Sequence, residues 1–440
     1  MARPLSYAEI DAQVLRGLAP AGRGYWLAVG LCFFGILVGA GCWAFQIATG
    51  LGAAGINVPV AWSTYLVNFV FWVGIAHSGT LISAILFLFR ARWRTAIARS
   101  AEAMTVFAVM VAGLFPFIHL GRVWIFYWIL PYPNQRTLWP NLQSPLLFDL
   151  VAISTYLTVS ALFWYAGMVP DLATLRDRTE GLRRRLYGLF SLNWTGSHRQ
   201  WHHYGWAYVF LAALATPLVI SVHSVVSWDF ALSILPGWHS TIFAPYFVAG
   251  AIHSGLAMVL VLLIPLRRIY GLEEIIDAET LEKIAKTLIL TCLIVGYSYG
   301  VEFFLAWYSG EAAELGTFVA RARGHYSPEF WLMLICNSVV PLACFLRRVR
   351  RSPRALFAVG VAVTIGMWFE RYVIIIGAPT HAHDPYTWRL FQGPTWVEYG
   401  ILVGSFSLFF FLFLLFTKFL PCISLAEVKE ERVATAGEAP

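Results

Sequence analysis

The sequence predicts an all-α membrane protein that crosses the bilayer ten times, with both termini in the cytoplasm. Three observations lead to this class: apolar runs as long as a bilayer is thick, alternation of basic and non-basic loops, and an internal repeat. The chain of 440 residues is 59% hydrophobic and only 12% charged. Because a soluble chain of this length needs far more charge to cover its surface, a polytopic helical protein is expected.

Ten apolar runs are each long enough to cross the hydrocarbon core as a helix. They lie near 25–48, 64–89, 101–125, 146–169, 204–227, 242–266, 283–308, 328–346, 355–376 and 395–420. Three segments outside them are expected on the cytoplasmic side: the N-terminal 1–24, a linker at 171–203 and a tail at 421–440.

Basic residues alternate between the loops. The exits of the second, fourth, sixth and eighth runs carry arginine clusters, including Arg90, Arg92, Arg94 and Arg99 after the second, whereas the odd-numbered exits are poor in them. The positive-inside rule then predicts cytoplasmic termini and puts the exit of the third run in the periplasm of a Gram-negative bacterium. The net charge of +7 is therefore a topology signal and not a sign of nucleic-acid binding.

An internal repeat supports this count. FVFWVGIAHSGTLISAILFLFRARWR in the second run resembles PYFVAGAIHSGLAMVLVLLIPLRR in the sixth, and both contain His-Ser-Gly. Because an even number of runs separates the copies, the two halves lie parallel in the membrane. The predicted domains are two four-helix bundles, 25–170 and 204–346, followed by two further helices in 355–420.

Ionisable residues inside the runs mark candidate functional positions, because such groups are costly at membrane depth. His77 and His253 lie near mid-membrane, at matching positions of the repeat. Glu370 and Arg371 are adjacent, so they are expected to point to different faces and to find separate partners. The residues near the periplasmic ends are His119, Arg122, Asp149, His223, Asp229, Glu302, Arg371 and Glu398.

The periplasmic group fits the requirements of quinol oxidation. A carboxylate or imidazole must accept a hydroxyl proton, and a second group must hold the other ring oxygen. His119 and Asp149 fit the first role, because the loop between them can bring them together. Asp229 and Arg371 would complete the pocket from other helices.

Each of these residues also has a structural interpretation. Arg122 can anchor a helix end by snorkelling, and Asp149 occupies a first helical turn, where the helix dipole stabilises a carboxylate. His77 and His253 precede Ser-Gly, which favours close helix packing. The shared placement of the group at one face is what supports a site.

The motifs WSTYLVNFVFWVGIAHSG, AGLFPFIHLGRVWIFYWILPYPN, SPLLFD and SVHSVVSWDFALSILPGWHS resemble the NrfD-like family of polysulfide reductase membrane subunits. Within it they resemble the quinol-binding membrane subunit (ActC) of bacterial alternative complex III, over about 25–420. The resemblance implies an inner-membrane subunit without haem or iron–sulfur cluster of its own. It implies a quinol site, with menaquinol favoured over ubiquinol, formed by His119, Asp149, Asp229 and Arg371, with Arg122 beside them.

The same resemblance implies partners and a proton route. The partners are a periplasmic iron–sulfur subunit, a paralogous NrfD-like membrane subunit, c-type cytochrome subunits and lipids. The iron–sulfur subunit is expected over loops 126–145, 229–241 and 377–394. The proton-route candidates are His77, His223, His253, Glu302 and Glu370.

Three other functions stay open at this point. The chain could be the paralogous subunit, with a structural or proton-conducting role and no active quinone site. A haem b cytochrome would need facing histidines, and His77 and His253 share a depth, as do His119 and His223. A secondary transporter would suit the parallel repeat with polar groups at mid-membrane.

Overall fold

The computed structural model describes residues 6–57, 60–130, 145–381 and 393–437. Within these ranges ten helical segments are long and apolar enough to cross a membrane, which confirms the predicted number. They contain α2 (Arg23–Thr49), α3 (Ser63–Thr80) continued by α4 (Leu86–Leu88), α5 (Ala98–Ala112) with α6 (Phe115–His119), α7 (Pro145–Arg178), α9 (His198–Ala231), α10 (Phe243–Ile269), α11 (Ala278–Tyr308), α13 (Ser327–Leu334), α15 (Pro353–Tyr372) and α16 (Trp396–Phe419).

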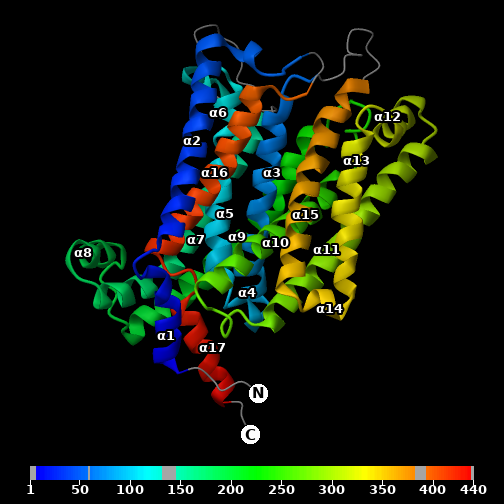
Figure 1. Ribbon diagram of the computed structural model, residues 1–440. Helices are drawn as coiled ribbons and strands as arrows, with labels where there is room; N and C mark the ends of the chain where they lie inside the picture. The colour runs from blue at the N-terminus through cyan, green and yellow to red at the C-terminus, as the bar shows by residue number, and fades with distance from the viewer. Residues whose placement is uncertain (1–5, 58–59, 131–144, 382–392, 438–440) are drawn as a thin grey trace.

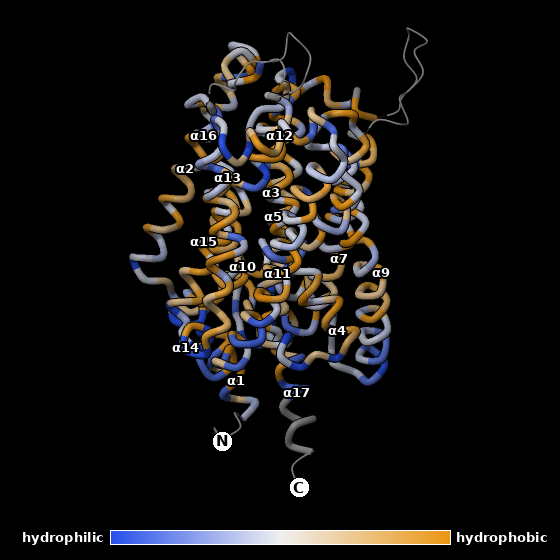
Figure 2. The backbone as a smooth tube through the Cα atoms, turned by 90° about the vertical axis from the view of Figure 1, so that its right-hand side faces the viewer, coloured by the Kyte–Doolittle hydropathy of each residue, from blue (hydrophilic) through white to orange (hydrophobic). Residues whose placement is uncertain are grey.

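The long helices run side by side, and the short helices gather at the two ends of the bundle (Figure 1). α1 (Tyr7–Leu15), α8 (Gly181–Phe190), α14 (Arg347–Arg350) and α17 (Leu425–Gly437) lie at one end, which we call the terminal end because the first and last described helices are there. α6 and α12 (Ala312–Arg323) lie at the opposite end. Hydrophobic residues dominate the middle of the bundle and hydrophilic residues its ends, as a bilayer requires (Figure 2).

Two helices form the centre of the bundle. In the apolar windows of the second and sixth spans, 83% and 78% of the residues are buried, against 22% in the first span, so α3 and α10 are central and α2 is peripheral. The two His-Ser-Gly motifs meet at the α3–α10 interface, where the Ser78 hydroxyl donates to the Ile252 carbonyl at 2.7 Å. The Ser-Gly pairs therefore allow close helix packing.

The remaining helices pack around this centre. α3 packs on α5, α7 lies along α9, and α10 contacts α9, α11 and α15, while α2 packs along α16 (Figure 1). The predicted boundary between 25–170 and 204–346 would separate α7 from α9, although these two helices pack along each other. The division into two bundles stays a prediction.

The third span is shorter than the predicted 101–125. α5 ends at Ala112, and the short α6 ends at His119. Pro116 at the start of α6 has no N–H to continue the ladder of α5. Gly121 then takes φ +67°, a left-handed conformation that turns the chain out of the helix. His119 therefore lies at a helix end and not within a continuous span.

The segment predicted as linker 171–203 is largely helical. α7 continues through Pro170 to Arg178, α8 covers Gly181–Phe190, and α9 begins at His198. The start of α9 is set by Ser197, whose hydroxyl accepts from the Gln200 N–H in a capping box. Both long helices therefore extend beyond the apolar runs from which they were predicted.

Substitution of Gly255 by Ala is expected to destabilise the protein, because α3 approaches α10 at this glycine. An added Cβ would lie 2.6 Å from Ser78 Cβ and 2.8 Å from the Ile75 carbonyl oxygen. Overpacking of this kind costs about 1–3 kcal/mol, which a thermal unfolding curve in detergent would detect. Gly300 on α11 is the matched control, since nothing lies within 4 Å of its added Cβ. Equal stability of the two variants would contradict close packing at the repeat motifs.

Candidate functional site

Asp149 and Asp229 form a carboxyl pair between α7 and α9. Asp149 lies near the start of α7 and Asp229 near the end of α9, and the antiparallel packing of these helices places them opposite each other. Their carboxyl groups lie within hydrogen-bonding reach of each other. No other described group bonds to either Oδ1 atom, although both atoms are buried.

This arrangement constrains the chemistry of the pair. Two ionised carboxylates in contact repel each other strongly in a low-dielectric site, so a hydrogen bond between them needs one proton. A pair that holds one proton can accept another and release it again. The structure thus brings together two predicted site residues that are 80 positions apart in the chain.

His119 ends α6 and stacks on Trp62, with ring centroids 4.1 Å apart and planes inclined by 22°. Gln46 of α2 holds α6 in place by donating to the Ile118 carbonyl at 2.8 Å. The buried Nδ1 of His119 has no hydrogen-bond partner among the described residues. No ion pair or hydrogen bond between described residues joins His119 to Asp149 or Asp229. Arg122 follows in the loop and is exposed, which agrees with an anchoring role.

Arg371 and Glu370 correct the sequence-based expectation. They were expected to point to different faces, yet their side chains form an ion pair, and both are almost fully buried. Glu370 also accepts from Tyr299, and Asn337 donates to the Tyr299 hydroxyl at 3.0 Å. Side chains of adjacent residues can meet when both are long, and burial away from water leaves this ion pair as the best available compensation.

Arg371 faces the centre of the bundle. A Cβ on Gly74 of α3 or Gly250 of α10 would lie 3.4 Å or 3.6 Å from its Nη2. The Nη2 and Nε atoms have no hydrogen-bond partner among the described residues. Arg371 therefore occupies a notch between the two central helices, and its described bonds do not reach the aspartate pair.

His77 and His223 contact each other in the same region. Their ring centroids are 4.4 Å apart, and the rings are inclined by 63°. The His77 nitrogens lie 2.9 Å from the Val73 carbonyl and 2.6 Å from the Val219 carbonyl, whereas the His223 nitrogens have no described partner. A haem between two axial histidines would have to separate the rings and occupy one nitrogen of each, so this contact does not fit one.

His253 and Glu302 contact other residues than the His77–His223 pair does. His253 Nδ1 lies 2.9 Å from the Thr291 hydroxyl of α11. Glu302 interacts electrostatically with Arg321 of α12, which itself donates to the Gly237 carbonyl at 2.8 Å. Glu314 accepts from the Gly237 N–H, and burial raises the pKa of its carboxyl. Glu302 thus belongs to a separate cluster with Arg321, also toward the end of the bundle opposite the termini, and not to the aspartate pair.

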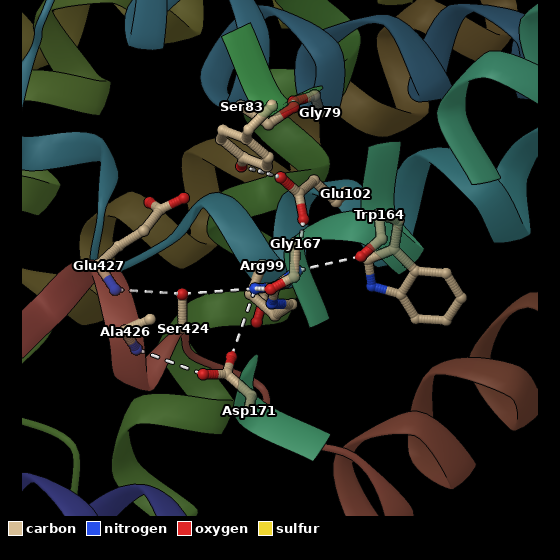
Figure 3. Close-up of polar contacts among 12 residues, drawn as sticks. Gly79, Ser83, Arg99, Glu102, Trp164, Gly167, Asp171, Ser424, Ala426 and Glu427 are labelled. Carbon is tan, nitrogen blue, oxygen red and sulfur yellow. Dashed lines mark hydrogen bonds and ion pairs between the residues drawn. The ribbon is translucent and has the colours of Figure 1, made fainter. Parts of the chain in front are cut away.

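A buried ionic cluster near the terminal end was missed by sequence reasoning (Figure 3). Arg99 was interpreted as a loop arginine that sets topology, but its side chain is only 1% exposed. It pairs with Glu102 at 3.1 Å and with Asp171 at 3.3 Å, and it donates to the carbonyls of Gly167 and Trp164. Two carboxylates beside apolar runs, Glu102 and Asp171, are the sequence feature that could have indicated a buried ionic cluster.

The chain segment before and within α17 closes this cluster. The Ser424 hydroxyl accepts from Arg99 at 3.3 Å, and the Ala426 N–H donates to Asp171 at 3.3 Å (Figure 3). Glu427 pairs with Arg94 at 2.8 Å, and Arg94 also donates to the Ser83 carbonyl. Buried charged groups therefore bind the C-terminal segment to the start of α5 and to the last part of α7.

Glu398, predicted only as a periplasmic carboxylate, organises the loop that leads into α3. Its carboxylate accepts from the Gly55 N–H at 2.8 Å, from the Ser63 and Thr64 hydroxyls, and from the Thr395 N–H at 2.9 Å. A buried carboxylate with this many donors is a structural cap.

Two expected docking loops lie largely outside the described residues. Residues 131–144, with Tyr132 and Trp139, and residues 382–392 belong to loops 126–145 and 377–394. In the part of the chain that the structure describes, no group of three or more His, Cys, Asp and Glu side chains is arranged to hold a metal ion.

Comparison with known proteins identifies similar sequences over most of the chain. A family model described as polysulphide reductase, NrfD, matches residues 53–381. A protein of Halobacterium salinarum, described as a putative membrane subunit of dimethyl sulfoxide reductase, is 28% identical over 364 residues. That alignment covers 81% of this chain and 77% of the relative.

Proposed function

Because the chain belongs to the NrfD family of polysulfide reductase membrane subunits, we propose that it oxidises quinol at the end of the bundle opposite the termini. Members of this family are membrane subunits of reductase-type respiratory complexes, and they work with iron–sulfur subunits and quinone. The observation that carries the proposal is the Asp149–Asp229 pair. The two carboxyl groups lie within hydrogen-bonding reach of each other, and their buried Oδ1 atoms have no other described partner.

The proposed reaction removes two protons and two electrons from a quinol. The aspartate pair accepts one hydroxyl proton, because a carboxyl pair with one shared proton has an oxygen free for a second. His119, with its unbonded Nδ1 and its stacked ring, accepts from the other hydroxyl. The electrons leave to the iron–sulfur partner subunit, which supplies the redox centre.

The arginine distribution supports the proposed sidedness, and the sequence resemblance described above supports the proposed partners. The basic terminal end faces the cytoplasm of a bacterial inner membrane, and the aspartate pair lies toward the periplasm. In this proposal the complex is an alternative complex III with c-type cytochrome subunits and a paralogous membrane subunit. Menaquinol is the favoured substrate over ubiquinol.

The core polar residues are proposed to conduct protons. His77 and His223 touch, Arg371 lies near both, and Glu370 connects Arg371 to Tyr299 and Asn337. His253 and Glu302 flank this group on α10 and α11. The chain of side chains lies between the central helices, where water is scarce.

The competing proposal is the paralogous subunit without an active quinone site. It is favoured by the placement of Arg371, whose described ion pair is with Glu370 and not with the aspartates. In that subunit the same polar core would only conduct protons or stabilise the fold.

Replacement of His119 by Ala tests the proposal in the purified complex. We expect quinol-dependent reduction of the partner's iron–sulfur centres to slow by about 100-fold, the lower end of what a general base contributes. His202→Ala is the control, because His202 is exposed on α9. Wild-type rates for His119→Ala, together with a complex that co-purifies without quinone, would favour the paralogous subunit.

A further inference from the structure

A large groove lies outside the aspartate site, between α13, α15 and α16. Its volume is about 1700 Å³, and none of Asp149, Asp229, His119 and Arg371 lines it. It runs from Thr395, at the end of the bundle opposite the termini, to Phe406 near the middle of α16. At 1.5 Å per helical residue this run is about 16 Å, roughly the depth of one leaflet of the hydrocarbon core.

The walls of the groove are aromatic. Trp368 and Tyr372 of α15 stack with ring centroids 5.6 Å apart and planes inclined by 26°. Tyr326 lies 6.2 Å from Tyr372, and Tyr399 of α16 faces the same space. Flat rings that line a space of this kind suit a flat ligand ring, because aromatic pairs favour stacked and edge-on contacts.

The groove opens sideways to the membrane. Ile365 is 45% exposed and Tyr399 is 53% exposed, and both line the groove on faces that the bundle does not cover. A ligand can therefore enter from the bilayer and does not have to cross water.

The polar side chains that could bind a ligand are confined to the outer end. Glu329, in the first turn of α13, has a buried Oε2 atom without a hydrogen-bond partner among the described residues. His325, four residues earlier in the chain, also lines the groove. Deeper in the groove, the Thr364 hydroxyl is already bonded to the Gly360 carbonyl at 2.8 Å. The groove is thus polar at its outer end and apolar in its deeper part.

The charge of the groove lining favours a quinol over a phospholipid as the ligand. The described lining contains no Lys or Arg, so a phospholipid phosphate would have no permanently charged cation to pair with and would lie near the Glu329 carboxylate. A quinol hydroxyl, in contrast, donates a hydrogen bond to a carboxylate oxygen. The isoprenoid chain would fill the apolar part between Thr364 and Phe406.

We propose that the α13–α15–α16 groove is a second binding site for an isoprenoid quinol, with the ring at Glu329 and the tail between α15 and α16. The site binds quinol without electron transfer and holds it next to the membrane pool. It is independent of proton transfer at Asp149 and Asp229.

The quinol form of a photoreactive azidoquinone with a decyl tail, kept reduced during illumination, tests this site on the full chain in phosphatidylethanolamine nanodiscs. We expect crosslinks on α15 and α16, mapped by mass spectrometry. Leu402→Trp, which fills the groove, should reduce them at least fivefold. Leu290→Trp on α11, at a position 58% exposed, is the matched control and should leave them unchanged. Glu329→Gln should weaken probe binding about tenfold, as expected for a lost bond to a charged acceptor.

The outcomes separate this site from the proposed catalytic one. Groove crosslinks that persist in Asp149→Asn support a second site, whatever that variant does to activity. Crosslinks confined to residues near Asp149, or groove crosslinks that survive Leu402→Trp, would overturn it. Phospholipid that co-purifies with wild type and is lost in Leu402→Trp, without any quinone crosslink, would assign the groove to lipid instead.

Discussion

Replacing Asp149 with Asn is expected to lower quinol oxidation by the assembled complex by about 100-fold or more. The amide cannot accept a proton at neutral pH, and a positioned general base contributes about 10²–10⁴ to a rate. Asp229→Asn should have a similar effect, because the two carboxyl groups act on the same proton. The measurement is the turnover number and KM for quinol of the purified complex.

The double variant sharpens this test. If the two carboxyl groups are one functional unit, Asp149→Asn with Asp229→Asn should be little slower than either single variant, since groups that act together are not additive. Asp177→Asn is the matched control, because Asp177 lies on the same helix with a side chain 63% exposed. A complex that keeps wild-type turnover with Asn at position 149 would exclude the pair as proton acceptor.

Replacing Arg99 with Leu is expected to cause the largest loss of stability. The change leaves Glu102 and Asp171 buried without their shared cation, and it removes the donor to the Gly167 carbonyl at 2.6 Å. Removal of one partner from a buried ion pair costs about 3–5 kcal/mol. The loss would be measured as a lower midpoint of thermal unfolding and a lower yield of monodisperse protein in detergent.

Two further variants separate charge from packing. Arg176→Leu removes a cation whose partner, Asp177, is largely exposed, so the change should stay within about 1 kcal/mol. Leu at positions 99, 102 and 171 together should recover much of the stability, because a buried ion cluster can be replaced by apolar side chains of similar volume. If the triple variant is as unstable as Arg99→Leu, the cluster stabilises by its hydrogen bonds and packing and not by charge compensation.

The cluster also links the C-terminal segment to the bundle. Ser424 and Ala426 bond to Arg99 and Asp171, and Glu427 pairs with Arg94. Arg99→Leu should therefore increase hydrogen exchange at the start of α17 before it affects α3 or α10. Because α3 and α10 are the most buried spans, their amides should be the last to exchange.

Much of the fold could be predicted from apolar run lengths. In lipid the backbone hydrogen bonds must be satisfied within the protein, so a run of about 20 apolar residues is expected to form a membrane-spanning helix. The prediction failed where local chemistry competed with the run, as at Pro116 and Gly121, which end the third span at His119. Hydropathy also did not predict that α9 begins at His198, because the capping box at Ser197 sets this start.

For the candidate site, the sequence by itself determined which ionisable residues enter the membrane, because hydropathy and the cost of buried charge are local properties. It could not determine which of them meet. Asp149 lies opposite Asp229 only because α7 packs antiparallel to α9. Arg371 pairs with its neighbour Glu370 and not with a distant aspartate, and Arg99 is buried and not in a basic loop. The tertiary structure decided these partners, because helix packing sets which side chains lose water, and each buried charge then has to take the nearest group that can compensate it.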